Sequence, residues 1–272
     1  GHWAMQDNTT GTENVAIGKS ALYNNTTGGA NVAIGAGTMS TAHTTGSSNV
    51  GVGYRAMYSS TASSDNVAIG YEALHSTQTG AGNVALGRGS LRSNTAGSNI
   101  AVGRNSLYAN TSGTRNIAVG YGALDAPDTE NDNLAIGYDA LGGTIAGGEF
   151  NVAIGNYSMD ALTSGDKNTA VGYNALTANT SGGMNTAVGE QALASNTTGD
   201  TNEAFGRMAL TANTTGSYNS AMGSGSMVAN TEGLKNVGIG AEALDANTTG
   251  DENVGLGYRA GNVITTGNQN VI

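Results

Sequence analysis

The sequence predicts an all-β protein, a parallel β-solenoid of about fifteen coils, and three observations support this fold class. Asn recurs every 17 residues, with intervals of 18 after Asn31 and Asn133 and of 16 after Asn83. Gly lies four residues after this Asn in all fifteen complete units, from Gly18 to Gly257. Aliphatic side chains keep a fixed place in each unit, which is typical of a stacked repeat and not of a disordered tract.

Each unit contains two β-prone segments separated by turn signals. Positions are numbered from the repeated Asn, so that in the first complete unit Asn14 is position 0, Ile17 is +3 and Leu22 is +8. Val-Ala-Ile at +1 to +3 predicts a short strand, and Ala-Leu at +7 and +8 predicts a second, weaker strand before the Asn-Thr-Thr-Gly turn. One coil per unit, stacked at about 4.8 Å, predicts a rod roughly 70 Å long.

The side chains of the first strand divide between two faces, because positions 0, +2 and +4 lie on one face and +1 and +3 on the other. Position +2 is always Ala or Gly, which predicts a narrow interior closed by the Leu or Met at +8. Position +1 is Glu203 in one coil, and a Glu in a dry interior is costly without partners. We therefore expect +1 and +3 to point outward. The alternative places +1 and +3 inside and leaves a flat Asn, Ala and Gly face on a monomer.

An outward row of aliphatic side chains predicts self-association. Two such residues per coil exceed the contiguous apolar surface that a monomer usually exposes. Parallel association around an axis would bring the bulky Phe205 and Met222 into adjacent layers of the interface. The residues predicted for this interface are Val15, Ile17, Val32, Ile34, Val67, Ile69, Phe205 and Met222.

Two positions hold the same residue in every complete unit, and we expect both to have structural roles. The Asn at position 0 is expected to form an internal ladder, in which each side-chain amide bonds to its neighbour one coil away. The Gly at +4 is expected to need either a positive φ or a close approach of another backbone segment.

Four arginines form the candidate ligand site. Between Glu72 and Asp125 the sequence contains no acidic residue, although the rest of the chain is acidic. Arg88 and Arg104 both occupy +5 in consecutive coils, so they should stack about 5 Å apart, which is unfavourable without an anionic partner. We predict a basic belt that meets phosphate or carboxylate groups of a surface glycan, with side chains splayed into solvent as the alternative. The belt comprises Arg88, Arg92, Arg104 and Arg115.

Two further features leave alternatives open. The acidic loop 125–132 contains four carboxylates and the only Pro, so it is either a Ca²⁺ site or a solvated turn. Tyrosines at +5 either stack on sugars or shield the rim of the subunit interface. These tyrosines are Tyr54, Tyr71, Tyr121, Tyr138, Tyr173 and Tyr258.

Composition argues against several function classes. The chain has no Cys, three His and no convergent set of acid, base and nucleophile, so we expect neither an enzyme nor a bound metal or cofactor. The net charge of −10 argues against nucleic-acid binding. No apolar run approaches the length of a membrane span, so any membrane anchoring is expected to come from regions outside this chain.

The two ends of the sequence indicate the bounds of the repeat domain. We expect residues 1–5 to be a cloning remnant and residues 6–272 to be a single continuous repeat domain. Asn270-Val271-Ile272 resembles the start of another repeat, so we expect a fragment of a longer fibre protein.

The pentapeptide Asn-Val-Ala-Ile-Gly at 14–18, 31–35, 66–70 and 151–155 resembles the head repeat of YadA-like trimeric autotransporter adhesins. The longer unit 168–182 is similar to repeats of phage tail fibres and of surface fibres of predatory bacteria. The resemblance implies a left-handed parallel β-roll and a parallel homotrimer. It also implies an extracellular location, either on the bacterial cell surface or in a virion tail fibre. The coil is longer than in the adhesin heads, so we expect Asn-Thr-Thr-Gly to make a longer outer turn.

Three functions are compatible with these observations. The first is a surface fibre or adhesin head segment that attaches to a host, prey or matrix surface, with a surface glycan or anionic polysaccharide as partner. The second is a phage tail-fibre shaft or spacer. The third is an ice-binding solenoid, because Thr and Asn in register can form a flat ladder.

Overall fold

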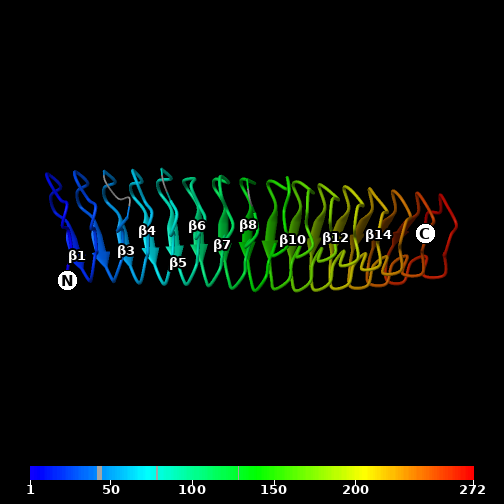
Figure 1. Cartoon of the computed structure of the whole chain (residues 1–272). Coiled ribbons are helices and arrows are strands. Elements are labelled where there is room, and N and C mark those ends of the chain that lie inside the picture. Colours follow the sequence, from blue (N-terminus) through cyan, green and yellow to red (C-terminus); the bar gives the residue numbers. More distant parts are fainter. Residues whose placement is uncertain (42–44, 78, 128) are drawn as a thin grey trace. The chain divides into compact units, whose positions relative to one another are not determined.

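The computed structural model of the chain describes residues 1–41, 45–77, 79–127 and 129–272. It divides into two compact units, Gly1–Asn133 and Leu134–Ile272. In the described residues every strand has three residues and every coil of the repeat contributes one strand. The fold class predicted from the repeat, an all-β parallel solenoid, is therefore confirmed (Figure 1).

Strands follow one another in chain order within each unit. The first unit contains β1 (Val15–Ile17), β2 (Val32–Ile34), β3 (Val50–Val52), β4 (Val67–Ile69), β5 (Val84–Leu86), β6 (Ile100–Val102) and β7 (Ile117–Val119). The second unit contains β8 (Leu134–Ile136), β9 (Val152–Ile154), β10 (Thr169–Val171), β11 (Thr186–Val188), β12 (Glu203–Phe205), β13 (Ser220–Met222), β14 (Val237–Ile239) and β15 (Val254–Leu256).

Neighbouring strands pair in parallel with identical positions opposite each other. In β5 and β6, for example, Val84 faces Ile100 and Leu86 faces Val102. The register is kept although this interval is one residue shorter than the others, so the deletion is absorbed outside the strand. Each side chain therefore lies directly beside the same position of the next coil.

The interior is narrow, as the small residues at +2 predicted. Ala68 at +2, Ala73 at +7 and Leu74 at +8 have no exposed surface, and the same three positions are buried in most coils. A Cβ added to Gly51 at +2 would lie 2.9 Å from Cε of Met39, so the side chain at +8 closes the interior against +2. Burying one such Leu stabilises the fold by about 2 kcal/mol.

The expected second strand at +7 and +8 is wrong. This segment is a series of turns, because non-glycine residues at +6 and +8 adopt left-handed backbone conformations, such as Glu72 with φ 52° and Leu74 with φ 51°. A third residue of this kind precedes the Asn, as in Asp65 with φ 58°. Each costs roughly 1 kcal/mol. Backbone hydrogen bonds between coils offset this cost, since the amide of Leu74 donates to the carbonyl of Ser90 at 2.9 Å.

The Gly at +4 combines both of the predicted reasons. Gly189 has φ 138°, and a Cβ placed on it would lie 2.5 Å from the carbonyl oxygen of Gly206 in the next coil. No other residue type satisfies both demands at this corner of the coil.

The Asn at position 0 forms the predicted ladder. The backbone amide of Asn202 donates to Oδ1 of Asn185 at 2.9 Å, and Nδ2 of Asn185 donates to the carbonyl of Gly199 at 2.8 Å. Each buried side chain thus supplies an acceptor to the next coil and a donor to its own turn. This arrangement satisfies buried polar groups that would otherwise destabilise a narrow core.

A second Asn ladder runs along position +11, inside the segment that the sequence suggested was only a turn. Nδ2 of Asn196 donates to Oδ1 of Asn179 at 3.0 Å, and Nδ2 of Asn213 donates to Oδ1 of Asn196 at 2.8 Å. Oδ1 of Asn247 is buried without a partner, because the following coil has Ile264 at +11 and offers no donor.

Residues 1–5 belong to the repeat geometry. The amide of Met5 donates to the carbonyl of Ala21 at 2.9 Å, and Trp3 and Met5 have the left-handed conformations of +6 and +8, with φ 62° and 54°. A Cβ on Gly1 would approach Gly18 as the other +4 glycines approach theirs. The fold therefore shows no boundary at residue 6.

Candidate functional site

Two surfaces stand out, an apolar row along the strands and a pocket lined by arginine. The apolar row consists of the side chains at +1 and +3. Strands β2 to β15 show an exposed or half-exposed residue on each side of a buried Ala or Gly, as in β4, where Ile69 is 42% exposed and Ala68 is fully buried. The outward orientation inferred from the small +2 residues is therefore correct, and the alternative with +1 and +3 inside is not.

All eight residues predicted for the interface lie in the apolar row. In the first unit Ile17 is 57% exposed and Val15 is 44% exposed, while in the second unit Phe205 is 38% and Met222 is 53% exposed. The remaining members, exposed or half-exposed, are Val32, Ile34, Val67 and Ile69. A shallow pocket of ≈130 Å³ lies against Phe205, Met222 and Ile239. Glu203, Ser220 and Ala221 line the same hollow.

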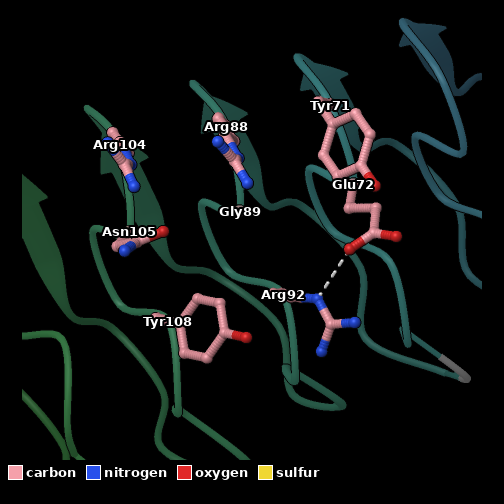
Figure 2. A pocket seen from close by; sticks show the side chains of 8 residues that line it. All are labelled: Tyr71, Glu72, Arg88, Gly89, Arg92, Arg104, Asn105 and Tyr108. Carbon is pink, nitrogen blue, oxygen red and sulfur yellow. Dashed lines mark hydrogen bonds and ion pairs between the residues drawn. The ribbon is translucent and has the colours of Figure 1, made fainter.

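Three of the four arginines of the predicted basic belt line one pocket. Arg88, Arg92 and Arg104 surround a space of ≈190 Å³ in the first unit (Figure 2). The other lining residues are Tyr71, Glu72, Gly89, Asn105 and Tyr108. We call this the arginine pocket.

Arg115 is not part of the arginine pocket. It precedes an Asn, at the opposite end of the strand from +5, and its guanidinium forms a two-pronged contact with Asp132. Nε lies 2.6 Å from Oδ1 and the terminal nitrogen Nη2 lies 2.7 Å from Oδ2. Arg115 thereby lowers the pKa of the Asp132 carboxyl. The expected belt of four is corrected to a cluster of three, because the repeat places +5 and −1 at different corners of the coil.

Arg88 and Arg104 lie side by side in consecutive coils and point the same way, as their shared +5 position predicted (Figure 2). The guanidinium carbon of Arg88 lies 5.4 Å from the Tyr71 ring centre, and that of Arg104 lies 5.6 Å from the Tyr121 ring centre. The two cations are thus held between aromatic rings of the adjacent coils. Among the residues that the structure describes, no carboxylate forms an ion pair with either.

Arg92 differs from these two because it has a carboxylate partner. Its Nε lies 3.0 Å from Oε2 of Glu72, and its guanidinium carbon lies 5.7 Å from the Tyr108 ring centre. Burial opposes ionisation of Glu72, but the hydrogen bond and charge of Arg92 outweigh it, so the pKa of Glu72 lies below 4.5. The hydrogen bond to Glu72 likewise raises the pKa of Arg92. One Glu against three Arg leaves the pocket positive.

Glu72, Asn105 and Tyr108 were missed from sequence. Their repeat positions, +6 and +9, could be read from the sequence. The left-handed residue at +6 brings +5, +6 and +9 to one corner of the coil, and the sequence does not show this turn. Comparing the +5 position between units identifies Arg88 and Arg104 but does not identify these three residues.

The other candidate sites have simpler surroundings. In loop 125–132, Asp128 lies outside the described residues, Asp132 binds Arg115 and Glu130 is 4% exposed. Over the described parts of the chain no group of three His, Asp or Glu side chains is placed to hold a metal ion. All six +5 tyrosines are 41% to 69% exposed. Tyr54 and Tyr71 stack with ring centres 5.4 Å apart.

The comparisons with known proteins add no relative. No protein-family model matches the chain, and the searches of curated proteins and of solved structures found no match. In the described residues no helix has the length and apolarity needed to cross a membrane.

Proposed function

We propose that the chain is a segment of a trimeric surface fibre, in which parallel chains pack their apolar rows around a common axis and present the opposite corners of the coils to a host, prey or matrix surface. The observation that supports this most directly is the apolar row. Large side chains such as Ile17 and Met222 are more than half exposed in an isolated chain. Such a surface on every coil is typical of an interface.

Symmetry favours a parallel arrangement around an axis. Equivalent positions of successive coils lie beside each other in strict register, so within each unit the apolar row of one chain matches the row of another copy. The second unit carries Thr169, Thr186, Glu203 and Ser220 at +1, while +3 stays apolar. We therefore place +3 closest to the axis and +1 nearer the rim.

The mass in solution tests the proposal. Light scattering coupled to size exclusion is expected to give three times the chain mass of 27.0 kDa. The variant Ile34→Glu with Ile69→Glu puts a charge into two nearby layers and is expected to elute as a single chain. The matched control adds the same charges at Thr27→Glu and Ala62→Glu, a +13 position that already accepts Glu232. A single-chain mass for the unaltered protein would overturn the proposal.

The proposed attachment of the fibre to a surface depends on the threefold repetition of its surface features. Three copies of every surface feature multiply weak contacts by avidity. The fibre would lie outside the cell, on a bacterial surface or in a virion tail fibre, where it acts as an adhesin head or as a shaft that spaces another domain. Binding of the isolated protein to host or prey cells favours the adhesin, and lack of binding favours the spacer.

Ice binding is the second candidate, and one observation favours it. Ser181, Thr198, Thr215 and Thr249 form an exposed row at +13, interrupted by Glu232. The neighbouring Thr at +12 is not available to a ligand in the same way, since Oγ1 of Thr197 donates to the carbonyl of Thr214 at 3.0 Å. A single row is a narrow surface. Thermal hysteresis measured in an ice-growth assay would favour this candidate over the fibre.

A further inference from the structure

We propose that the arginine pocket binds the oxyanion of an acidic sugar, a carboxylate or sulfate group at the end of a surface glycan. This rests on the proposed function in one respect, because it assigns the pocket as the attachment surface of the fibre. The pocket itself lies within one chain, so its chemistry is independent of the number of chains.

Arg88 and Arg104 carry charge that no ion pair neutralises in the described residues. Arg88 and Arg104 occupy neighbouring strand ends about 4.8 Å apart. Their proximity is direct, since the amide of Asn105 donates to the carbonyl of Arg88 at 3.0 Å. Like charges in adjacent coils repel, and an anion that both contact removes this cost. Arg92, in contrast, is a cation that forms an ion pair with Glu72.

Neighbouring aromatic rings preorganise these two arginines for binding. The rings of Tyr71 and Tyr121 hold the guanidinium groups of Arg88 and Arg104 from the two sides of the pair. Stacking fixes the plane of a guanidinium and leaves its N–H edges free, and these edges match the two oxygens of a carboxylate or sulfate. Less side-chain entropy is then lost on binding.

The size of the arginine pocket limits the ligand. A space of ≈190 Å³ is smaller than the roughly 300 Å³ at which pockets for drug-sized ligands begin. It fits one charged sugar and not a longer segment. Asn105 and Tyr108 line the same space and supply an amide and a hydroxyl for sugar hydroxyl groups.

The acidic balance of the chain limits the kind of anion that the pocket can bind. Residues 73–124 contain no acid, yet the chain as a whole has a net charge of −10. A dense polyanion that extends beyond the pocket meets repulsion there, whereas a glycan with one acidic sugar and neutral neighbours does not. This favours a sparsely charged glycan over a nucleic acid.

The test uses the whole chain and three small probes, 3′-sialyllactose with a carboxylate, 3′-sulfated lactose with a sulfate, and lactose with neither. Ligand-observed NMR in low salt gives a Kd for each. At least tenfold tighter binding of one acidic probe than of lactose is expected, and the two acidic probes distinguish carboxylate from sulfate. Equal binding of all three, or no binding of either acidic probe, would overturn the proposal.

Variants assign the binding to the pocket. Arg88→Ser with Arg104→Ser is expected to weaken binding of the acidic probe at least tenfold. Ser fits this position, since Ser224 occupies +5 in another coil. Arg207→Ser is the matched control, because Arg207 is also at +5 but has Glu190 and Ser224 beside it in the adjacent coils, and it is expected to leave the Kd unchanged. Unchanged binding by the double variant would contradict the proposal.

A gain-of-binding variant completes the design. Glu72→Gln removes the one carboxylate that lines the pocket and releases Arg92, so binding is expected to tighten a few-fold, and less so in high salt. Gln is compatible with this left-handed position, because Gln191 adopts it with φ 58°. Light scattering on the same samples separates the two proposals. A single-chain mass with intact binding would overturn the trimer alone, and a trimer that ignores acidic probes would overturn the pocket alone.

Discussion

At the scale of single residues, the asparagine side chains connect one coil to the next. The carboxamide of Asn185 accepts from the backbone of Asn202 and donates to Gly199, and all three groups are buried. A buried carboxamide has no access to water, so both of its ends must bond within the protein. Asn is therefore required at this place by the backbone groups around it.

Asn185→Ala is expected to destabilise the protein by about 1–3 kcal/mol, because it leaves the buried Asn202 amide without its acceptor and removes one of the two donors to the Gly199 carbonyl, the other being Nδ2 of Asn196. The midpoint of urea unfolding measures the change. Thr198→Ala in the same coil removes an exposed hydroxyl and should stay within about 0.5 kcal/mol of the unaltered protein. Equal midpoints for the two variants would contradict a structural role of the ladder.

A second residue-scale prediction concerns Asp160. Burial, assisted by the charge of Asp139, raises the pKa of the Asp160 carboxyl above 3.8. The ionised form therefore costs stability, and the cost appears as pH rises above 3.8 and is complete above the folded-state pKa. Asp160→Asn is expected to raise the unfolding midpoint at pH 7 and to have little effect at pH 3. A stabilisation that is equal at both pH values would rule out ionisation as its cause.

At the scale of the coil, the strand was predictable and the corners were not. Val-Ala-Ile between Asn and Gly predicts β1 and its equivalents from β-branched residues and turn signals alone. The segment around Leu22 reads as a weak strand, yet Ser20 and Leu22 have φ of 55° and 51°. Hydrogen bonds to the next coil stabilise these conformations, and such contacts do not appear in the local sequence.

The same limit applies to the candidate site. Arg88 and Arg104 share a position in the repeat and could be placed together from spacing. The separation of Arg115 from them, and the approach of Glu72 to Arg92, depend on the path of the turn between strands. The repeat predicts that identical positions are neighbours in successive coils, but it does not predict which different positions meet, such as +6 and +9 in Glu72 and Arg92.

Gly189→Ala tests the coil corner. Its Cβ would lie 2.5 Å from the Gly206 carbonyl oxygen at a φ of 138°, so we expect a loss above about 4 kcal/mol or no folded protein. Gly225→Asn is the control, because its φ of 67° resembles that of Asn174 at the same +6 position and its neighbours leave space. Circular dichroism and urea unfolding compare the two. A folded Gly189→Ala protein with ordinary stability would contradict the steric argument.

At the scale of the whole molecule, stability and assembly are coupled if three chains share their apolar rows. Mass action then makes the melting temperature depend on protein concentration. Tenfold dilution is expected to lower it by a few degrees in the unaltered protein and to have no effect on the Ile34→Glu, Ile69→Glu variant. Calorimetry at two concentrations measures this. A melting temperature that is independent of concentration would argue against coupling.

Because neighbouring strands keep strict register, the number of coils can change without other changes to the sequence. Strand β11 pairs in parallel with β10 and β12, and all three have Ala at their middle position in the same register. Excising residues 185–201 would join Met184 to Asn202 and restore every ladder across the junction. Recombination between near-identical units can therefore lengthen or shorten the gene in steps of one coil, and selection can tune how far such a protein reaches.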